Sequence, residues 1–599
     1  SGLTIAYQYH FFIFIQMSNR HISKALGKQQ IGNIEEFLKT YSIIKATNDG
    51  ENHYAIKEII PITKLPMSDG DEIEIRLTDS DLDVIQFHDS FFTMNIKTTL
   101  NFSHELYDSL QQDIQESAKK LIDTQYLMIG WKSGSQAIGE YTVTHKGVTV
   151  DSTRQNSATY EAYLNNLYKP RSEKNNRKHI HTLYDSVEKF DTSICGAYVK
   201  ISDIKANTPI TVNIPLSIPF DDILCFTGFV DYPNKLFGEL VFKFRINMRS
   251  LVYARVNPHK SMIFEVGKKR ERYDAIGGQN YSDIMKMVLQ QPNSQLEYDR
   301  MFTQIGDSSR QFKWKYNINE ASESPKTVDG FISDDVITNF VPTVLSAETV
   351  RCSATICGYR VTREALARLH DYFTSKPFVI PSQRVETKTF QTAATPSGFQ
   401  QCQTNIPLNH VTNLVLLFPK NSRQITCFEN PMLNNLQLSV GNRNFPEKPL
   451  NTMDQQFFQM MLNASDLDAL FECTDEYEDS LTVPRADGES IHIPQTDLTS
   501  FAITLQAERS GGPGVYFDGL HSNGENRAIE LRGAPIYSGE TDTYYNVRKR
   551  LVDAPTRPPA PLLCTVQDCF WIFSTKNGGE CHYIKDHTAE EVLTGMGYM

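Results

Sequence analysis

The chain has 599 residues, of which 40% are hydrophobic and 11% aromatic, so it can bury more than one sizeable core. Its formal net charge of -12 argues against a protein that coats nucleic acid over a broad basic face. The ten cysteines include no Cys-x-x-Cys pair, and those in strand-like stretches are Cys195, Cys225, Cys352, Cys357, Cys564 and Cys569. We therefore expect buried thiols in a reducing compartment rather than the disulfide framework of a small secreted domain.

Residues 1–34 are interpreted as an N-terminal arm. Ala6–Met17 is apolar and aromatic, but it is shorter than the roughly 20 residues that span a bilayer and lacks the basic region and cleavage site of a secretion signal. Met17 is a candidate natural start, in which case residues 1–16 would be upstream translation. Ser18–Gln30 is polar and mildly basic, which is typical of a flexible tail.

Residues 35–338 are predicted to form a first β-unit, because apolar and polar residues alternate in several stretches. The predicted strands are Ile73–Leu77, Phe92–Phe102, Glu140–Thr144, Ile210–Leu216 and Leu240–Met248. Apolar residues three or four apart predict helices over Ser103–Leu121 and Tyr160–Tyr168, with a further helix-like piece at Asp283–Leu289. Lys169–Lys178 is a basic loop, typical of a solvated turn or of a contact with an acidic partner or nucleic acid.

Residues 339–599 are predicted to form a second β-unit that opens with a strand at Val350–Arg360. A helix is expected over Thr362–Phe373, with Leu366, Leu369 and Phe373 on one face. The later strands expected are Leu414–Phe418, apolar on both faces, Phe501–Glu508, with alternate residues in a core, and Cys564–Phe573. The cluster Arg509–Gly514 predicts a hairpin turn after the second of these.

One short string occurs twice and suggests that the two units are similar. Asn213-Ile214-Pro215-Leu216 ends ten residues before Phe226, and Asn405-Ile406-Pro407-Leu408 ends ten residues before Phe418. Chance remains an alternative explanation for a four-residue match.

The motifs of the chain lead us to expect no catalytic, cofactor-binding or metal-binding residue. The chain contains no Gly-x-x-x-x-Gly-Lys-Ser/Thr, His-Glu-x-x-His or Gly-x-Ser-x-Gly motif. The weaker candidates are His179 with His181, Cys581 with His582 and His587, and the acidic stretch Glu472–Asp479. They lack a complete set of zinc ligands or the spacing of a calcium loop.

Several motifs occur together in the last third of the chain. They are Gly441–Pro449, Asp454–Phe458, Ala464–Asp468, Phe501–Glu508, Phe517–Leu520 and Ile529–Tyr537. With Trp131–Gln136, Gln155–Lys174, Val212–Ile246 and Gly358–Arg384, they resemble the major capsid proteins of the Polinton/Maverick (adinto-like) family of DNA viruses and transposons. The resemblance covers most of the chain after about Phe91.

This resemblance implies a mainly β fold with two tandem jelly-roll β-sandwiches and short helices in the loops. It implies a homotrimer that forms pseudo-hexameric capsomers, which tile an icosahedral shell around double-stranded DNA. The expected partners are further trimers and penton and minor capsid proteins, with the genome contacted only indirectly or through the N-terminal arm. The alternative to upstream translation of residues 1–16 is that this arm packs under a neighbouring subunit. Assembly inside the host cell is expected, with no membrane span and a final location in the virion.

Two alternatives stay open from the residues themselves. A β-sandwich carbohydrate-active enzyme would need two carboxylates that meet across strands, which a sequence pattern does not reveal. An adhesion or lectin-like module would need secretion, which the absence of a visible signal and the cysteine pattern both disfavour.

Overall fold

The computed structural model describes the β framework of the chain. The residues described are 53–102, 126–160, 192–193, 195–200, 203–226, 229, 231–256, 263–266, 269–272, 303–304, 313–318, 326–331, 342–375, 377–390, 399–419, 426–428, 433–451, 455–456, 458–459, 501–507, 519–522, 526–535, 560–575 and 580–584. The N-terminal arm, the helices expected at Ser103–Leu121 and Asp283–Leu289, the basic loop Lys169–Lys178 and the hairpin turn Arg509–Gly514 lie outside them.

Eight strands of the first half form a sandwich of two antiparallel sheets. In chain order they are β1 (His53–Ile59), β3 (Glu72–Arg76), β4 (Val84–Asn101), β6 (Ile138–His145), β7 (Val148–Thr153), β10 (Ile210–Pro219), β11 (Leu240–Ile246) and β18 (Thr343–Arg360). One sheet has the order β1-β18-β4-β10, with the short β2 (Met67–Ser68) also paired to β18, and the other has the order β3-β11-β6-β7. We call these the β1 sheet and the β3 sheet.

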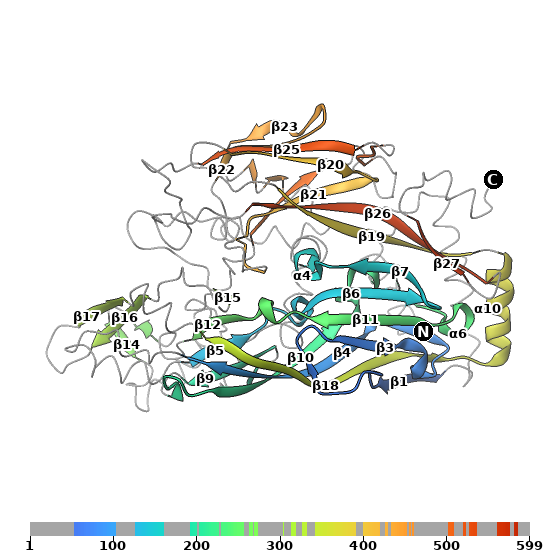
Figure 1. The fold of residues 1–599 in the computed structure, drawn as a ribbon, viewed down its shortest axis with the longest axis horizontal. Coiled ribbons are helices and arrows are strands. Elements are labelled where there is room, and N and C mark those ends of the chain that lie inside the picture. The colour runs from blue at the N-terminus through green and yellow to red at the C-terminus, as the bar shows by residue number, and fades with distance from the viewer. Residues whose placement is uncertain are drawn as a thin grey trace.

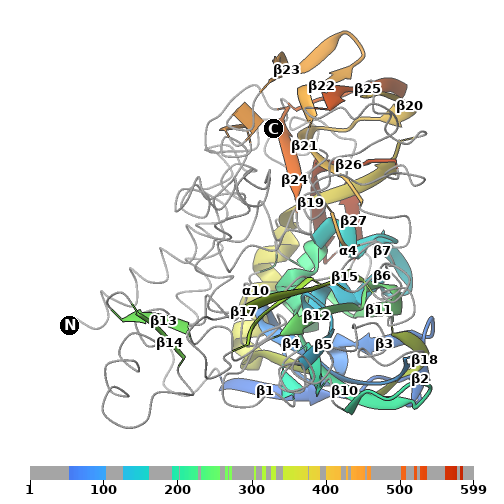
Figure 2. The same cartoon turned by 90° about the vertical axis from the view of Figure 1, so that its left-hand side faces the viewer.

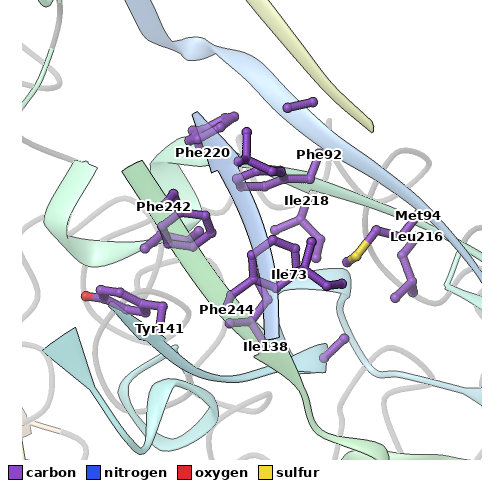
Figure 3. Packing of buried hydrophobic residues seen from close by; sticks show 14 of the residues in the cluster. Ile73, Phe92, Met94, Ile138, Tyr141, Leu216, Ile218, Phe220, Phe242 and Phe244 are labelled. Carbon is purple, nitrogen blue, oxygen red and sulfur yellow. The ribbon is translucent and has the colours of Figure 1, made fainter. Parts of the chain in front are cut away.

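Alternation along the strands explains why the two sheets pack face to face. Phe92, Met94 and Ile96 of β4 are buried, whereas Lys97 on the same strand is exposed. In Figure 3 the side chain of Phe92 lies close to Phe242 and Phe244 of β11 between the sheets, with ring centroids 5.2 Å and 5.4 Å apart, and Met94 lies beside Leu216. The outer face of the β3 sheet instead carries ion pairs, such as Lys243 with Glu74 at 3.1 Å.

Eight strands of the second half form another sandwich. They are β19 (Phe378–Thr389), β20 (Phe399–Pro407), β21 (Val411–Leu417), β22 (Leu433–Val440), β23 (Arg443–Leu450), β24 (Ala502–Gln506), β25 (Asn526–Pro535) and β26 (Leu562–Ser574). The β19 sheet has the order β19-β26-β21-β24, with β27 (Glu580–Ile584) paired to β26, and the β20 sheet has the order β20-β25-β22-β23. Figures 1 and 2 show this second sandwich above the first.

The two sandwiches have the same topology. When the eight strands of each are numbered in chain order, one sheet reads 1-8-3-6 and the other reads 2-7-4-5 in both halves. Two four-stranded antiparallel sheets connected in this order form a jelly roll. The chain is therefore mainly β and contains two tandem jelly rolls, as expected from the sequence; we call them the first roll and the second roll.

Further strands belong to the loops of the first roll. The sheet β15-β12-β5-β9-β8 contains β5 (Tyr126–Gly130), β8 (Thr192–Ser193), β9 (Gly196–Lys200), β12 (Val252–Val256) and β15 (Thr303–Gln304). Two ribbons join β13 (Ile263–Val266) to β14 (Lys269–Arg272) and β16 (Lys313–Ile318) to β17 (Lys326–Phe331). All these strands come from the connections between the third and fourth, fifth and sixth, and seventh and eighth strands, so the first roll carries its insertions at one end (Figure 1).

Short helices also lie in the connections between strands. They are η1 (Leu77–Ser80), η3 (Gly134–Ala137), α4 (Asn156–Thr159), η6 (Phe220–Asp222), η7 (Leu224–Phe226), α6 (Asn234–Phe237) and η8 (Met248–Ser250). The longer α10 (Arg363–Ser375) joins the last strand of the first roll to the first strand of the second (Figure 1). It buries Ala365, Leu369 and Phe373, so the predicted helix is confirmed, with Ala365 rather than Leu366 in the buried stripe.

One sequence-based expectation is wrong. The strand Val350–Arg360 was expected to open the second unit, but it belongs to β18, which pairs with β1 and β4 and closes the first roll. The boundary between residues 338 and 339 therefore separates this strand from the roll that contains it. The two units are similar, as the repeated Asn-Ile-Pro-Leu string suggests. The two copies of the string are nevertheless not equivalent positions, because Asn213–Leu216 lies in the sixth strand of the first roll, whereas Asn405–Pro407 lies in the second strand of the second roll.

Candidate functional surfaces

An aromatic cluster joins the two rolls. Phe237 of the first roll stacks on Phe378 of the second, with ring centroids 5.3 Å and planes 6° apart. The ring centroid of Phe573 on β26 lies 5.5 Å from that of Phe237 and 5.4 Å from that of Tyr232, and all four side chains are buried. These aromatic residues belong to the same continuous core as the interior of the first roll. The rolls are thus held together by apolar packing of the kind found inside a domain.

A second apolar contact involves the outer face of the β19 sheet. The inner face of this sheet packs within the second roll through residues such as Leu416 and Ile503. The opposite face, which includes Val385, Val415 and Val566, packs against the first roll. The residues supplied by the first roll are Ala158 and Tyr160, in and just after α4, and Leu224 of η7. The β19 sheet is therefore buried on both faces, as predicted for Leu414–Phe418.

A buried polar bridge crosses the same boundary. Asp151 of β7 accepts a hydrogen bond from the hydroxyl of Tyr141 at 3.2 Å and lies 3.8 Å from the guanidinium of Arg384 on β19. Burial raises the pKa of Asp151, although the positive charge of Arg384 and the bond from Tyr141 act in the opposite direction. An ionised Asp151 carboxylate contributes less to folding stability than its contacts with Tyr141 and Arg384 suggest, because the cost of removing its charge from water outweighs them.

His145 is the other titratable group at this boundary. Its Nε2 lies 2.9 Å from the carbonyl oxygen of Phe237, and its ring meets that of Phe573 edge to face at 5.7 Å. Burial lowers the pKa of His145, the carbonyl of Phe237 raises it, and the charge of Lys146 lowers it further. The neutral imidazole, with Nε2–H as the donor, is the form that suits this apolar position.

The connections after the fifth strand of each roll begin in the same way. In the first roll the buried Asn156 of α4 donates from Nδ2 to the carbonyl oxygen of Ile138, the first residue of the fourth strand, at 3.1 Å. In the second roll Gln456, also helical and buried, donates from Nε2 to the carbonyl oxygen of Leu433, the first residue of the fourth strand, at 2.7 Å. Asn156 and Gln456 are thus equivalent positions that anchor a short helix to the same strand of their rolls.

Large apolar side chains remain exposed at a few described positions. They are Tyr54, Ile56, Ile60, Ile62, Val148, Leu345, Val350 and Phe458. Tyr54 and Ile56 lie on β1, the edge strand of the β1 sheet, and are 50% and 60% exposed. They point away from the core, because the intervening Ala55 and the nearby Ile59 pack into it. Phe458, 51% exposed, lies two residues after Gln456.

The six cysteines expected to be buried thiols are all buried, and none of the six forms a disulfide. Burial raises the pKa of Cys195 and Cys564 to about 12, so both thiols stay protonated at neutral pH. Of the weaker metal candidates, His179, His181, His587 and Glu472–Asp479 lie outside the described residues. Within the described residues, no group of three His, Cys, Asp or Glu side chains is arranged to hold a metal ion.

The same described residues include no helix that is both long and apolar enough to cross a membrane. Sequence reasoning did not identify Tyr54, Ile56 or the pair Asn156 and Gln456. The stretch Asp454–Phe458 is one of the motifs that carry the resemblance. That its Gln456 is equivalent to Asn156 follows only from the strand carbonyl to which each side-chain amide donates, which the folded structure shows.

Solved structures that are similar to this chain come from a virophage and from viruses. A chain of the Sputnik virophage is 11% identical with a TM-score of 0.44, and the match covers 90% of both chains. The major capsid protein of mavirus is 7% identical (TM-score 0.39; 90% of this chain and 92% of that one), and that of Faustovirus is 9% identical (0.38; 87% and 90%). No protein-family model matches the sequence, and no curated protein matches it. The order of the strands in the four sheets is what identifies the two jelly rolls.

Proposed function

We propose that this protein is the major capsid protein of a DNA virus or a related transposon, with the Polinton/Maverick family as the specific assignment. The observation that carries the proposal is the repetition of one jelly-roll topology within a single chain. Jelly rolls are building blocks of viral capsids. Two such rolls in one rigid subunit give six similar units when three subunits close into a ring, and such a ring can tile a hexagonal lattice. The sequence resemblance and the viral origin of the similar structures support the same assignment.

The apolar connection between the rolls supports a subunit that acts as one rigid body. Phe237, Phe378 and Phe573 tie the second roll to the core of the first. A lattice needs subunits of fixed shape, because flexible linkage between the rolls would allow many different contacts. In this proposal three such subunits form a homotrimer.

The loops at one end of the first roll have a specific role in the proposal. They contain the sheet β15-β12-β5-β9-β8. In the proposed trimer we assign them to the outer surface. Trimers contact further trimers and penton and minor capsid proteins, and the genome is reached indirectly or through residues 1–34. Assembly takes place inside the host cell, and the protein ends in the virion.

The test is light scattering coupled to size exclusion, with negative-stain images of the same peak. We expect a mass of three chains with hexagonal outlines, or closed shells. A chain that stays monomeric across salt and pH would contradict the proposal. Hydrolysis of a polysaccharide by the purified protein would favour the carbohydrate-active alternative, and binding to a glycan array without assembly would favour the lectin-like one.

A further inference from the structure

The contact between the rolls within one chain joins two specific surfaces. One is the outer face of the β19 sheet, represented by Val385 and Val415. The other is the connection after the fifth strand of the first roll, where α4 supplies Ala158. Figure 1 shows α4 directly below β19 and β26. Both surfaces have an equivalent in the other roll, because the two rolls share one strand order.

The first equivalent surface is the outer face of the β1 sheet. β1 occupies the same place in its sheet as β19, at the edge and next to the eighth strand. Tyr54 and Ile56 lie on its outward face opposite Tyr359 and Cys357 of β18. Unlike Val385 of β19, which is buried against the first roll, Tyr54 and Ile56 are exposed. An edge strand with exposed apolar side chains is a site for contact with another chain.

The second equivalent surface is the connection after β23. Asn156 and Gln456 mark the same point in the two connections, since each donates to the first carbonyl of the fourth strand of its own roll. Counting two residues on from these amides gives Ala158 in the first roll and Phe458 in the second. Ala158 is buried against the β19 sheet, whereas Phe458 is exposed. Phe458 therefore occupies the position from which Ala158 makes the contact between the rolls.

We propose that Phe458 of one copy packs on Tyr54 and Ile56 of a second copy, so that the contact between copies repeats the contact between the rolls. This inference rests on the proposed self-assembly and names the surfaces that it uses. Each copy offers one Phe458 surface and one β1 surface, so the contact is heterologous and closes when the ring is complete. A large aromatic side chain at the centre of such a contact is a typical hot spot.

The first experiment measures assembly of the full chain carrying Phe458→Glu or Ile56→Lys. Each change places a charge in an apolar contact, and we expect the concentration for half-dissociation of the trimer to rise at least about tenfold. The matched control is Val148→Glu, which charges a side chain that is 65% exposed on β7 and outside both surfaces. The control is expected to assemble like the unchanged protein. Thermal melting of each variant monitors folding.

The combined variant, Phe458→Glu with Ile56→Lys in one chain, tests whether the single variants lose assembly because the contact is broken or because the chain misfolds. Opposite charges then face each other at every copy-to-copy contact, and assembly should recover in low salt and weaken in high salt. If both single variants assemble normally, or if only one of them loses assembly, the pairing of these two surfaces is wrong, although the capsid proposal stands. If the unchanged protein never assembles, the capsid proposal itself fails.

A photo-cross-linking amino acid in place of Phe458 gives an independent readout that does not depend on a disruptive change. A mixture of light and nitrogen-15-labelled protein is irradiated, and the cross-linked peptides are identified by mass spectrometry. We expect mixed-isotope links from position 458 to the peptide that contains His53–Ile59 or to the neighbouring β18. Links only within one chain, or links to a different region of the second copy, would overturn the proposal.

Discussion

Phe237 and Phe378 stack in parallel across the boundary between the two jelly rolls, with 5.3 Å between their ring centroids. Phe237 ends the short helix α6 of the first roll, and Phe378 begins the first strand of the second. The contact lies beside the C-terminal end of α10, whose Phe373 touches both rings. The covalent link between the rolls and their apolar contact are thus at the same place, which explains how one chain forms a single body from two sandwiches.

Phe237→Ala is expected to lower the free energy of unfolding by about 3–5 kcal/mol, because it leaves a cavity between several aromatic rings. Denaturant unfolding followed by tryptophan fluorescence measures this, since Trp571 lies in the same core cluster. Val148→Ala, at an exposed position, serves as the control and should change the free energy by less than about 0.5 kcal/mol. Equal effects of the two changes would mean that the cluster does not hold the rolls together.

Gln456→Leu and Asn156→Leu should each destabilise the protein by about 1–3 kcal/mol, since each leaves a buried strand carbonyl without its side-chain donor. Chemical denaturation of both variants, with Lys448→Gln on the exposed part of β23 as the control, provides the measurement. Similar losses at the two positions are expected from their equivalent roles. A neutral effect of Gln456→Leu would argue against that equivalence.

His145 should make the protein less stable as the pH falls. The pKa of His145 is below its ordinary value of 6.5 in the folded protein, so the unfolded chain binds a proton more readily. The contribution to stability is therefore complete above pH 6.5 and is lost as the pH falls through the lowered pKa. Unfolding free energies of the unchanged protein and His145→Gln between pH 7.5 and about pH 5 test this. The variant should show the flatter profile, and parallel profiles would contradict the prediction.

Asp151 should make the protein less stable as the pH rises. Its pKa is raised above the ordinary value of 3.8, so its contribution to stability is present below that value and is lost as the pH rises through the raised pKa. Asp151→Asn keeps the shape and removes the charge, and we expect it to be at least as stable as the unchanged protein at pH 7, with a smaller advantage near pH 4. A variant that is less stable at pH 7 by more than about 3 kcal/mol would show instead that the bridge to Arg384 dominates.

Local patterns predicted the strands well but not their partners. The alternation in Phe92–Phe102 and the apolar run Leu414–Phe418 both became strands with the expected burial, because period and polarity are properties of a few adjacent residues. Val350–Arg360 was also recognised as a strand, yet it was assigned to the wrong unit. Its partner β1 lies about 300 residues earlier in the chain, and no local pattern reports such a pairing.

The candidate surfaces were also not predicted from the sequence, because they too depend on contacts between residues that are far apart in the chain. A repeated string such as Asn-Ile-Pro-Leu fixes only the local backbone, and in this protein its two copies occupy different strands of the jelly roll. The equivalent positions are instead Asn156 and Gln456. They are different residue types, but each donates a hydrogen bond from its side-chain amide to the first carbonyl of the fourth strand of its own roll. Exposure of Tyr54, Ile56 and Phe458 also depends on packing, since apolar residues in strands and helices are ordinarily expected inside.

The late position of β18 has a consequence for synthesis. His53 at the start of β1 pairs with Arg360 at the end of β18, and β18 also lies between β1 and β4 in the sheet. Translation at about 5–20 residues per second makes the ribosome take roughly 15–60 s to extend the chain from one partner to the other. During that time the β1 sheet lacks the strand that lies between β1 and β4, and the unpaired edge of β4 is open to wrong partners. Nascent chains of this protein are therefore expected to need protection by chaperones until residue 360 has left the ribosome.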